Sequence, residues 1–544
     1  MGNLRTALAA LGRVLRNPEM RRALIAWMGG WAAEWAWLVA LFVYAFGAGG
    51  LAVVGLVGLA RTLPAAILAP ALGSLTDRFP RQRVLLGVHA GRALLIGLAT
   101  VAVAAGWSPL VVYVIGSLDA LLAVLHRPTH ASMLPSLARS PDELVGANVA
   151  SSTVEAVGIL AGPVIGGALV ASGAVPLTFA APSLIFLLAA ASVAGLQPAQ
   201  QVRAGAKGGI ADTLLGGLHA LRDHPHAALL LGILAVQTLV RGVLSVLIVA
   251  GAVQLLSMGE EGVGFLNAAI GAGGFVGALS AMALVGRSRL ASGVVLGLVL
   301  WGTPILVTGI VPAVWVALLA MAVLGAGNAV LDVAAFTLLQ RSVPNAVRGR
   351  VFGVLEALVM LTVGIGAAVG PLLVSALGVQ GAFIATGAVL PVLGLVAWRG
   401  IAAADRRAVI PERELTLLRG VPMLQVLPLT VLEQLASDLR PMRYAAGDVV
   451  IEQGAAGDRF YVIGSGEVEV EADDRVVRRM GPGESFGEVA LLRDVPRTAD
   501  VVAISDLELY AVGRDAFVCA VTGDRQSMRE ADEVISERAP SAAG

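Results

Sequence analysis

The chain has 544 residues, of which 57% are hydrophobic and 14% are charged, and its formal net charge is zero. Soluble domains carry about 25% charged residues, so this composition argues against a chain built only of soluble domains. The balanced charge also argues against nucleic acid as a partner. The single cysteine, Cys519, excludes a disulfide within the chain.

Apolar runs follow one another from about residue 20 to residue 401, and we count twelve of them. Each has roughly 20 residues or more, which is enough for a helix to cross a ~30 Å hydrocarbon core. The runs cover 20–46, 51–74, 83–105, 109–135, 144–172, 176–196, 227–256, 262–285, 291–310, 313–340, 348–377 and 380–400. The sequence therefore predicts an α-helical protein with twelve transmembrane helices in contact with membrane lipid, preceded by a short N-terminal segment, 1–19.

The breaks between these runs alternate in charge. Those at 78–83 and 341–350 are rich in arginine, whereas those at 47–50 and 378–381 have no positive charge. Positively charged loops stay on the cytoplasmic side of a membrane. We therefore expect a multi-pass protein of the inner (plasma) membrane with both termini in the cytoplasm, which requires an even number of spans.

The longest break, about 197–225, divides the runs into two halves of six, 20–196 and 226–401. Landmarks of the first half recur in the second, because the pair Gly162-Pro163 in the fifth run reappears 208 residues later as Gly370-Pro371 in the eleventh. Matching landmarks at a fixed offset indicate an internal repeat. We expect two duplicated six-helix halves joined by a cytoplasmic loop.

Twelve spans in two repeated halves resemble the major facilitator superfamily of secondary transporters. The stretch GSLTDRFPRQR at 73–83 is similar to that family's loop motif G-x-L-x-D-R-x-G-R-[RK], with Pro80 where the family has glycine. The resemblance implies that the matching residues lock a cytoplasmic gate, and the alternative is a plain positively charged anchor. These gate candidates are Gly73, Asp77, Arg78 and Arg81.

A second motif, GILAGPVIGGALV at 158–170, resembles the antiporter motif G-x-x-x-G-P-x-x-G-G of the same superfamily. The resemblance implies an exporter. Small residues also let helix backbones approach closely and a proline bends a helix, so ordinary glycine-rich packing is the alternative. The matching residues are Gly158, Gly162, Pro163, Gly166 and Gly167.

Charged side chains inside apolar runs are costly and commonly functional. Glu34 in the first run is our candidate proton carrier, and Arg241 lies in the seventh run, the repeat partner of the first. We expect each to serve as a counter-ion of the other across a central cavity. The further candidates are Asp119, Glu155, Asp332 and Glu356, with Arg61 and Arg92 as possible partners, and for each of them a structural pair between helices is the alternative.

The sequence lacks the motifs of ATP-hydrolysing proteins and of hydrolases with a serine nucleophile. It has no G-x-x-x-x-G-K-[ST] phosphate loop for ATP hydrolysis and no G-x-S-x-G nucleophile elbow. We therefore predict that the chain is not an enzyme, has no catalytic residues, and needs no metal and no cofactor. An ion gradient is the expected energy source.

The amino-acid composition changes after about residue 405, where charged residues become frequent and the apolar runs become shorter. Short strand-like pieces separated by glycines cover 448–451, 459–464, 467–472, 475–480, 498–504 and 507–512. Such spacing predicts a compact β-roll. With helical stretches at 412–437 and 514–538, we expect a linker at 402–411 and a cytoplasmic domain at 412–540.

The stretch FGEVALLRDVPRTADV at 486–501 has the chemistry of a nucleotide site. A glycine before a helical turn exposes backbone N–H groups to an anion, Arg497 can grip a phosphate, and Glu488 can accept a hydrogen bond from a ribose hydroxyl. The tail also resembles cyclic-nucleotide-binding domains, whose phosphate-binding cassette reads F-G-E-[LI]-A-L-L…P-R-[TAS]-A-x-V. The resemblance implies a site formed by Phe486, Gly487, Glu488, Val489, Ala490, Arg497, Thr498 and Ala499.

The expected regulatory ligand is cAMP, with cGMP as the alternative, and the final helix is expected to cover the base with Met528 or Val534. The leading hypothesis is a secondary transporter, a proton-coupled exporter of an unidentified small amphipathic molecule, under control of the nucleotide. A receptor without net transport is one alternative. A tail that serves only for tethering or dimerisation is another, and the oligomeric state stays open.

Overall fold

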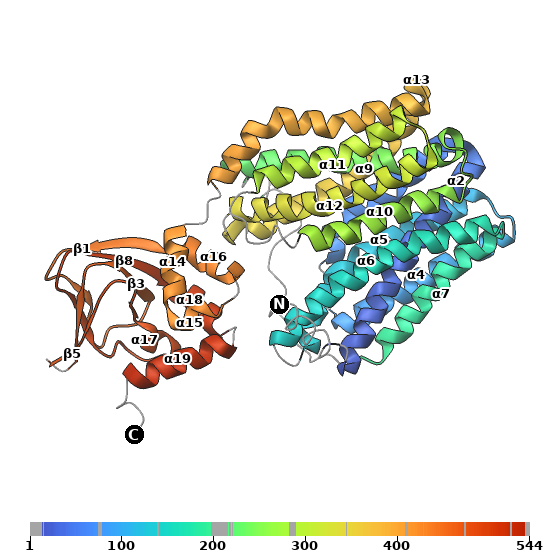
Figure 1. Ribbon diagram of the computed structural model, residues 1–544. Coiled ribbons are helices and arrows are strands. Elements are labelled where there is room, and N and C mark those ends of the chain that lie inside the picture. The colour runs from blue at the N-terminus through green and yellow to red at the C-terminus, as the bar shows by residue number, and fades with distance from the viewer. Residues whose placement is uncertain are drawn as a thin grey trace. The chain divides into compact units, whose positions relative to one another are not determined.

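The computed structural model describes residues 14, 16–73, 79–138, 141–196, 216, 219, 221–281, 290–343, 345–407, 412–427, 429–472, 475–522 and 525–538. The chain forms two compact units, Met1–Ala408 and Val409–Gly544. The first unit is a bundle of helices, and the second combines β-strands with short helices (Figure 1).

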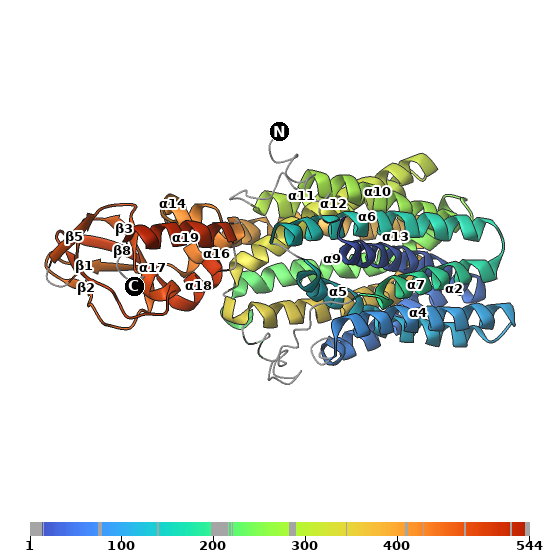
Figure 2. The same ribbon diagram turned by 90° about the horizontal axis from the view of Figure 1, so that it is seen from below.

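The helices of the first unit run side by side over most of their length (Figure 2). They are α2 (Pro18–Gly73), α4 (Arg81–Ala104), α5 (Pro109–Leu137), α6 (Pro141–Ala171), α7 (Val175–Ala194), α9 (Pro225–Ala250) with the π-helical η1 (Gly251–Leu255), α10 (Gly262–Ala281), α11 (Ala291–Ile310), α12 (Val314–Ser342) and α13 (Asn345–Arg407). Nine helices within the described residues are long and apolar enough to cross a membrane. The predicted multi-pass helical architecture is confirmed at this level.

The two longest helices bend at glycines. In α2, Gly50 has φ 68°, and in α13, Gly378 has φ 70°. Glycine adopts such left-handed conformations at little cost because it has no Cβ. Both glycines lie in uncharged breaks predicted from the sequence, so each long helix consists of two apolar segments. Beyond the last of these segments, α13 continues through residues 402–407 of the predicted linker, where alanine and arginine favour helix.

Glycines bring helix pairs into close contact at corresponding places in the two halves. A Cβ atom built on Gly162 of α6 would lie 2.5 Å from the carbonyl oxygen of Ala32 in α2. A Cβ atom built on Gly370 of α13 would lie 2.9 Å from Cβ of Val246 in α9. The repeat seen in the sequence therefore has a packing role, because only glycine permits these approaches.

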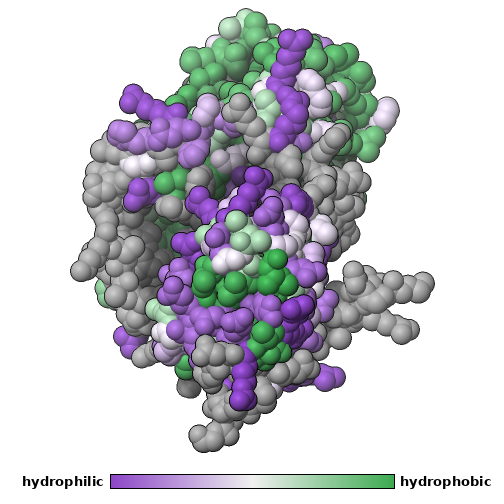
Figure 3. Space-filling model, turned by 90° about the vertical axis from the view of Figure 1, so that its left-hand side faces the viewer, coloured by the Kyte–Doolittle hydropathy of each residue, from purple (hydrophilic) through white to green (hydrophobic). Residues whose placement is uncertain are grey.

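The outer surface of the helical unit is strongly apolar. Leu395 is 78% exposed, Val396 76% and Trp315 72%, which suits a surface covered by lipid rather than water. Figure 3 contrasts this surface, in green, with the second unit, whose visible described surface is mainly polar and purple. The surface of the first unit therefore suits lipid, and that of the second suits water.

The second unit is built from two four-stranded sheets with the orders β1-β8-β3-β6 and β2-β7-β4-β5. The strands are β1 (Arg440–Tyr444), β2 (Val449–Ile451), β3 (Arg459–Ser465), β4 (Val468–Ala472), β5 (Arg475–Met480), β6 (Ser485–Phe486), β7 (Asp500–Ala503) and β8 (Leu507–Gly513). The helices are α14 (Glu412–Gly420), α15 (Pro422–Gln425), α16 (Leu429–Asp438), α17 (Glu488–Leu492), α18 (Arg514–Thr522) and α19 (Arg525–Arg538). The single helical stretch predicted at 412–437 is interrupted, because Gly420 and Pro422 separate α14 from α15.

Strand β3 serves two apolar cores because its side chains alternate between the faces of the sheet. Phe460 and Val462 pack against the helices, in a cluster that includes Phe517. Tyr461 and Ile463 point to the other side, into the cluster between the two sheets. This alternation fixes Tyr461 on the face where the nucleotide cassette lies.

Candidate functional site

The cassette at 486–499 begins on the first sheet. Strand β6 pairs with β3, with Phe486 opposite Tyr461, and the two rings stack with centroids 5.2 Å apart. Phe486 is 5% exposed, so its ring anchors the start of the cassette in the core between the sheets. The chain then turns at Gly487 into the five-residue helix α17.

Gly487 is required for two separate reasons. Its φ of 92° is strained for residues with a Cβ. A Cβ atom at this position would also lie 2.7 Å from Nη1 of Arg497. The glycine therefore makes the turn possible and leaves room for the guanidinium group.

Arg497 lies almost fully buried, with 5% of its surface exposed. Its Nη1 donates to the carbonyl oxygen of Gly487 at 3.0 Å and its Nη2 to that of Arg459 at 2.7 Å. The nearest carboxylate contact joins Nη2 to Oδ1 of Asp458 at 3.5 Å, and the Asp458 side chain is 65% exposed. A fixed guanidinium held mainly by neutral carbonyls is well prepared for an anion.

The other cassette residues differ in burial. Glu488 is 1% and Ala490 is 2% exposed, whereas Val489 and Ala499 are half-buried and Thr498 is exposed. Glu488 and Arg497 are thus both inside the domain, and Thr498 lies at its surface.

The final helix, α19, packs against its own domain. Ser527 donates to the carbonyl oxygen of Met423 at 2.6 Å, and Met528 and Val534 are partly buried in the apolar cluster around Phe517. Both side chains proposed from the sequence to cover the base are thus engaged by neighbouring helices. One cavity of this unit has Asp438, Asp458 and Asp515 in its wall, and the cassette residues do not line it.

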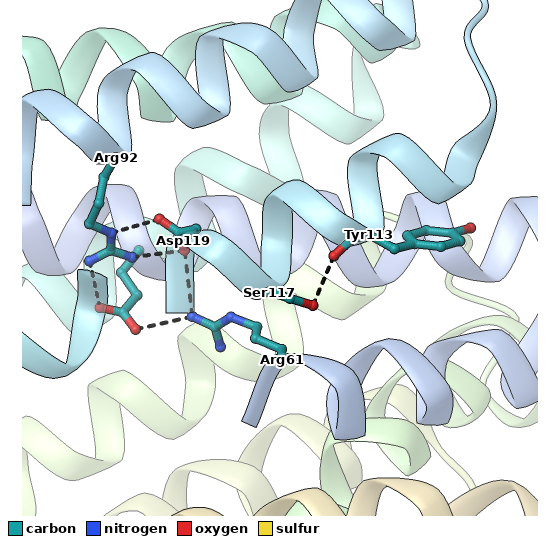
Figure 4. Close-up of polar contacts among 6 residues, drawn as sticks. Arg61, Arg92, Tyr113, Ser117 and Asp119 are labelled. Atoms are coloured by element: carbon teal, nitrogen blue, oxygen red, sulfur yellow. Dashed lines mark hydrogen bonds and ion pairs between the residues drawn. The ribbon is translucent and has the colours of Figure 1, made fainter. Parts of the chain in front are cut away.

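Within the helical unit, four charged side chains meet in a buried network (Figure 4). Arg92 of α4 binds Asp119 of α5 at 2.7 Å and Glu34 of α2 at 3.2 Å. Arg61, in the second segment of α2, lies 3.3 Å from Glu34 and 3.9 Å from Asp119. Arg92 and Asp119 are 0% exposed. Two positive and two negative charges compensate each other, as a buried charge requires.

The expected pairing of Glu34 with Arg241 is wrong. Arg241 donates to Oδ1 of Asn328 in α12 at 2.6 Å, and Nδ2 of Asn328 donates to Asp332 at 2.8 Å. Equivalent positions in two repeats need not face each other. Glu34 finds both its cations, Arg61 and Arg92, within its own half.

The remaining charged candidates lie apart from this network. Glu155 forms an ion pair with Arg127, and Glu356 is exposed on α13. Of the gate motif, Gly73 ends α2 and Arg81 begins α4. Asp77 and Arg78 fall outside the described residues. The Nη1 atom of Arg81 donates to the carbonyl oxygen of Ser132 at 2.8 Å, which joins α4 to α5.

The antiporter-like motif of α6 lies between two helices. Cβ atoms built on Gly158 and Gly166 would lie 2.7 Å from the oxygen of Met28 and 3.0 Å from Cβ of Val39, both in α2. A Cβ atom built on Gly167 would lie 3.0 Å from Cα of Gly264 in α10, and Pro163 lies within the helix. This geometry suits close packing, so the exporter assignment stays a prediction from the motif.

A cluster of three buried histidines was not considered from the sequence. The rings of His89 and His126 are 5.0 Å apart, and His130 stacks on Trp27 at 4.1 Å. Neither ring nitrogen of His89 has a hydrogen-bond partner among the described residues. The available signal was that three of the chain's six histidines lie in two neighbouring apolar runs. Within the described part of the chain, no group of three or more His, Cys, Asp or Glu residues is placed to hold a metal ion.

Comparisons with known proteins match two family models to this chain. Residues 230–444 match the family model of the Major Facilitator Superfamily, and residues 441–521 match that of the cyclic nucleotide-binding domain. These matches give the chain a transporter-type membrane domain and a C-terminal cyclic nucleotide-binding domain.

Two of the matching curated relatives are named as cyclic-nucleotide-dependent kinase proteins. The cAMP-dependent protein kinase regulatory subunit of Aspergillus fumigatus is 40% identical over 120 residues, which is 21% of this chain and 28% of that protein. The cGMP-dependent protein kinase of Plasmodium berghei is 40% identical over 82 residues, which is 15% of this chain and 10% of that protein. A crystal structure of the regulatory domain of Toxoplasma gondii PKA with cAMP is 32% identical, with a TM-score of 0.20, over 20% of this chain and 43% of that one. The chain thus spans less than a third of each of these curated relatives.

Proposed function

We propose that this protein is a secondary active transporter, a proton-coupled exporter of a small amphipathic molecule, whose activity is regulated by cyclic nucleotide bound to the C-terminal domain. The observation that carries the proposal is the presence, in one chain, of a Major Facilitator Superfamily domain and a domain with the buried Arg497 and Glu488 of a nucleotide cassette.

Twelve spans in two six-helix halves are part of this proposal. Nine described helices have the length and apolarity of spans, one shorter apolar helix covers Gly262–Ala278, and α2 and α13 each bend at a glycine into two segments. The distribution of arginine between the breaks supports cytoplasmic termini in the inner membrane. The efflux direction rests on the motif at 158–167.

For the tail we propose that Arg497 binds the cyclic phosphate and Glu488 the ribose. The carbonyl groups that hold Arg497 are neutral, so its charge remains available to a phosphate. We favour cAMP because one relative at 40% identity is a cAMP-dependent regulatory subunit. A cGMP-dependent kinase at the same identity supports cGMP as the alternative.

For the membrane unit we propose that Glu34 carries the coupling proton. Its side chain is 17% exposed, whereas Asp119 is fully buried, so Glu34 is the more accessible acid of the network. Protonation of Glu34 would weaken its hold on Arg61 and change the balance of charge between the helices.

Calorimetry on the full chain in lipid nanodiscs tests the regulatory half, with cAMP and cGMP as ligands. We expect micromolar or tighter binding of one nucleotide, lost in Arg497→Ala and kept in Arg493→Ala, since Arg493 is exposed on the same loop. Flux in proteoliposomes should then change when that nucleotide is added to the side of the tail. Absence of binding would reduce the tail to a tether, and binding without any flux would favour a receptor.

A further inference from the structure

The helical unit contains a cavity of about 150 Å³ between segments of α2, α9, α10 and α13. Arg61 and Arg241 are the charged residues in its described wall, and no carboxylate lines it. Each arginine comes from a different half of the repeat. The charged groups in the wall of this cavity are therefore guanidinium groups.

The two arginines differ in how well their charges are compensated. Arg61 lies 3.3 Å from Glu34. Arg241 donates to the amide oxygen of Asn328 at 2.6 Å, and the carboxylate of Asp332 lies beyond that amide. None of the ion pairs formed by the described residues includes Arg241. Arg241 is also the more exposed of the two arginines.

The rest of the wall is mostly apolar. Trp35 and Phe42 present aromatic rings, Val263 and Val363 add aliphatic surface, and Asn267 adds an amide. Pockets of this kind bury the body of a ligand against apolar groups and orient it through a few polar ones. An apolar wall with one poorly compensated cation suits an amphipathic anion and disfavours a cation.

We propose that this cavity binds a small organic anion, a monocarboxylate with a ring-sized apolar body, with Arg241 as its main anchor. A dry cavity of about 150 Å³ is large enough for a benzene ring, which sets the size of the body. Guanidinium binds carboxylate through two parallel hydrogen bonds. This inference deepens the proposed transport function by naming the substrate class, and it rests on that function.

The test uses the full chain in lipid nanodiscs and three probes built on one benzene ring: benzoate, benzamide and benzylammonium. Calorimetry should show that benzoate binds at least about tenfold more tightly than the neutral and cationic probes. Arg241→Gln should weaken benzoate binding at least about tenfold and Arg241→Lys less. Arg399→Gln, which removes an exposed arginine of α13 outside the cavity, should leave it unchanged.

Equal or tighter binding of benzamide or benzylammonium, unchanged benzoate affinity in Arg241→Gln, or no binding of any probe would each overturn the inference. Each preparation is also titrated with cAMP, so that an intact nucleotide response excludes misfolding of the tail. A normal nucleotide response with regulated flux of another solute would refute the anion site alone. Benzoate binding without flux of any solute would refute the transport function and leave the anion site standing.

Discussion

Replacement of Gly487 by alanine separates two effects at the nucleotide cassette, because the chain offers a matched control. Gly447 has φ 94° and Gly487 has φ 92°. A Cβ atom on Gly447 would meet nothing within 4 Å, whereas one on Gly487 would lie 2.7 Å from Nη1 of Arg497. Both variants strain the backbone, and only Gly487→Ala displaces the guanidinium.

The expected magnitudes follow from these contacts. Alanine in a left-handed conformation costs about 1–2 kcal/mol, so both variants should lower the free energy of unfolding by that amount. Loss of a hydrogen bond to a charged group adds about 1.5–3 kcal/mol in Gly487→Ala alone. Since about 1.4 kcal/mol corresponds to a factor of ten, nucleotide affinity should fall by about 10- to 100-fold in Gly487→Ala and stay unchanged in Gly447→Ala.

Residues 409–544 suit this measurement because they form a compact unit with two apolar cores of their own. Guanidinium denaturation gives the free energy of unfolding, and calorimetry with cAMP and cGMP gives the affinities. Equal losses of stability and affinity in the two variants would refute the role of the contact between Gly487 and Arg497. An unchanged affinity in Gly487→Ala would contradict the placement of the phosphate at Arg497.

Three further predictions concern other parts of the chain. Glu34→Gln should abolish proton-driven flux in proteoliposomes and leave nucleotide affinity unchanged; retained proton dependence would remove Glu34 as the carrier. Gly162→Val should lower the melting temperature of the full chain in detergent by several degrees, since its Cβ would lie 2.5 Å from a carbonyl oxygen, whereas Gly232→Ala, with nothing within 4 Å, should not. Burial, together with Asp458, raises the pKa of Tyr461 above the ordinary value of 10.0, so the fold favours the neutral phenol. This preference contributes fully to the free energy of unfolding below about pH 10 and is lost as the pH rises through the pKa of the folded state. Alkaline denaturation of residues 409–544 with Tyr461→Phe as reference measures this loss, and identical pH profiles would contradict it.

The positions of the membrane helices follow directly from the sequence because the hydrocarbon thickness dictates the length of each apolar run. For the strands of the second unit, local sequence patterns are a weaker guide. Strand β1, RPMRY, has no alternation and contains Pro441, and it exists because β8 offers it a partner at the edge of the sheet. Strand β6 has two residues, too few for any periodic pattern. Strand β1 was missed because pairing across the chain creates it.

The same distinction applies to the charged residues. Glu34, Asp119, Arg61 and Arg92 stand out in the sequence because each interrupts an apolar run. Their mutual contacts depend on which helices are neighbours and on how each helix is rotated about its axis. A local sequence pattern reveals neither the neighbours nor the rotation. That is why the sequence suggested Arg241 as the partner of Glu34, although the network closes within one half of the repeat.

Thermodynamics limits how strongly a bound nucleotide can change the rate of transport, whichever residues couple the nucleotide site to the membrane unit. A ligand shifts a transport equilibrium only by its differential affinity for the two states, and coupling between sites is typically about 5- to 150-fold. If the active state is populated at about one part in a hundred without nucleotide, such coupling raises it to between about 5% and about 60%. From that starting population, one cassette acting alone therefore raises flux by about 5- to 60-fold. An active state populated close to 100% at saturating nucleotide would require several cassettes acting together in an oligomer.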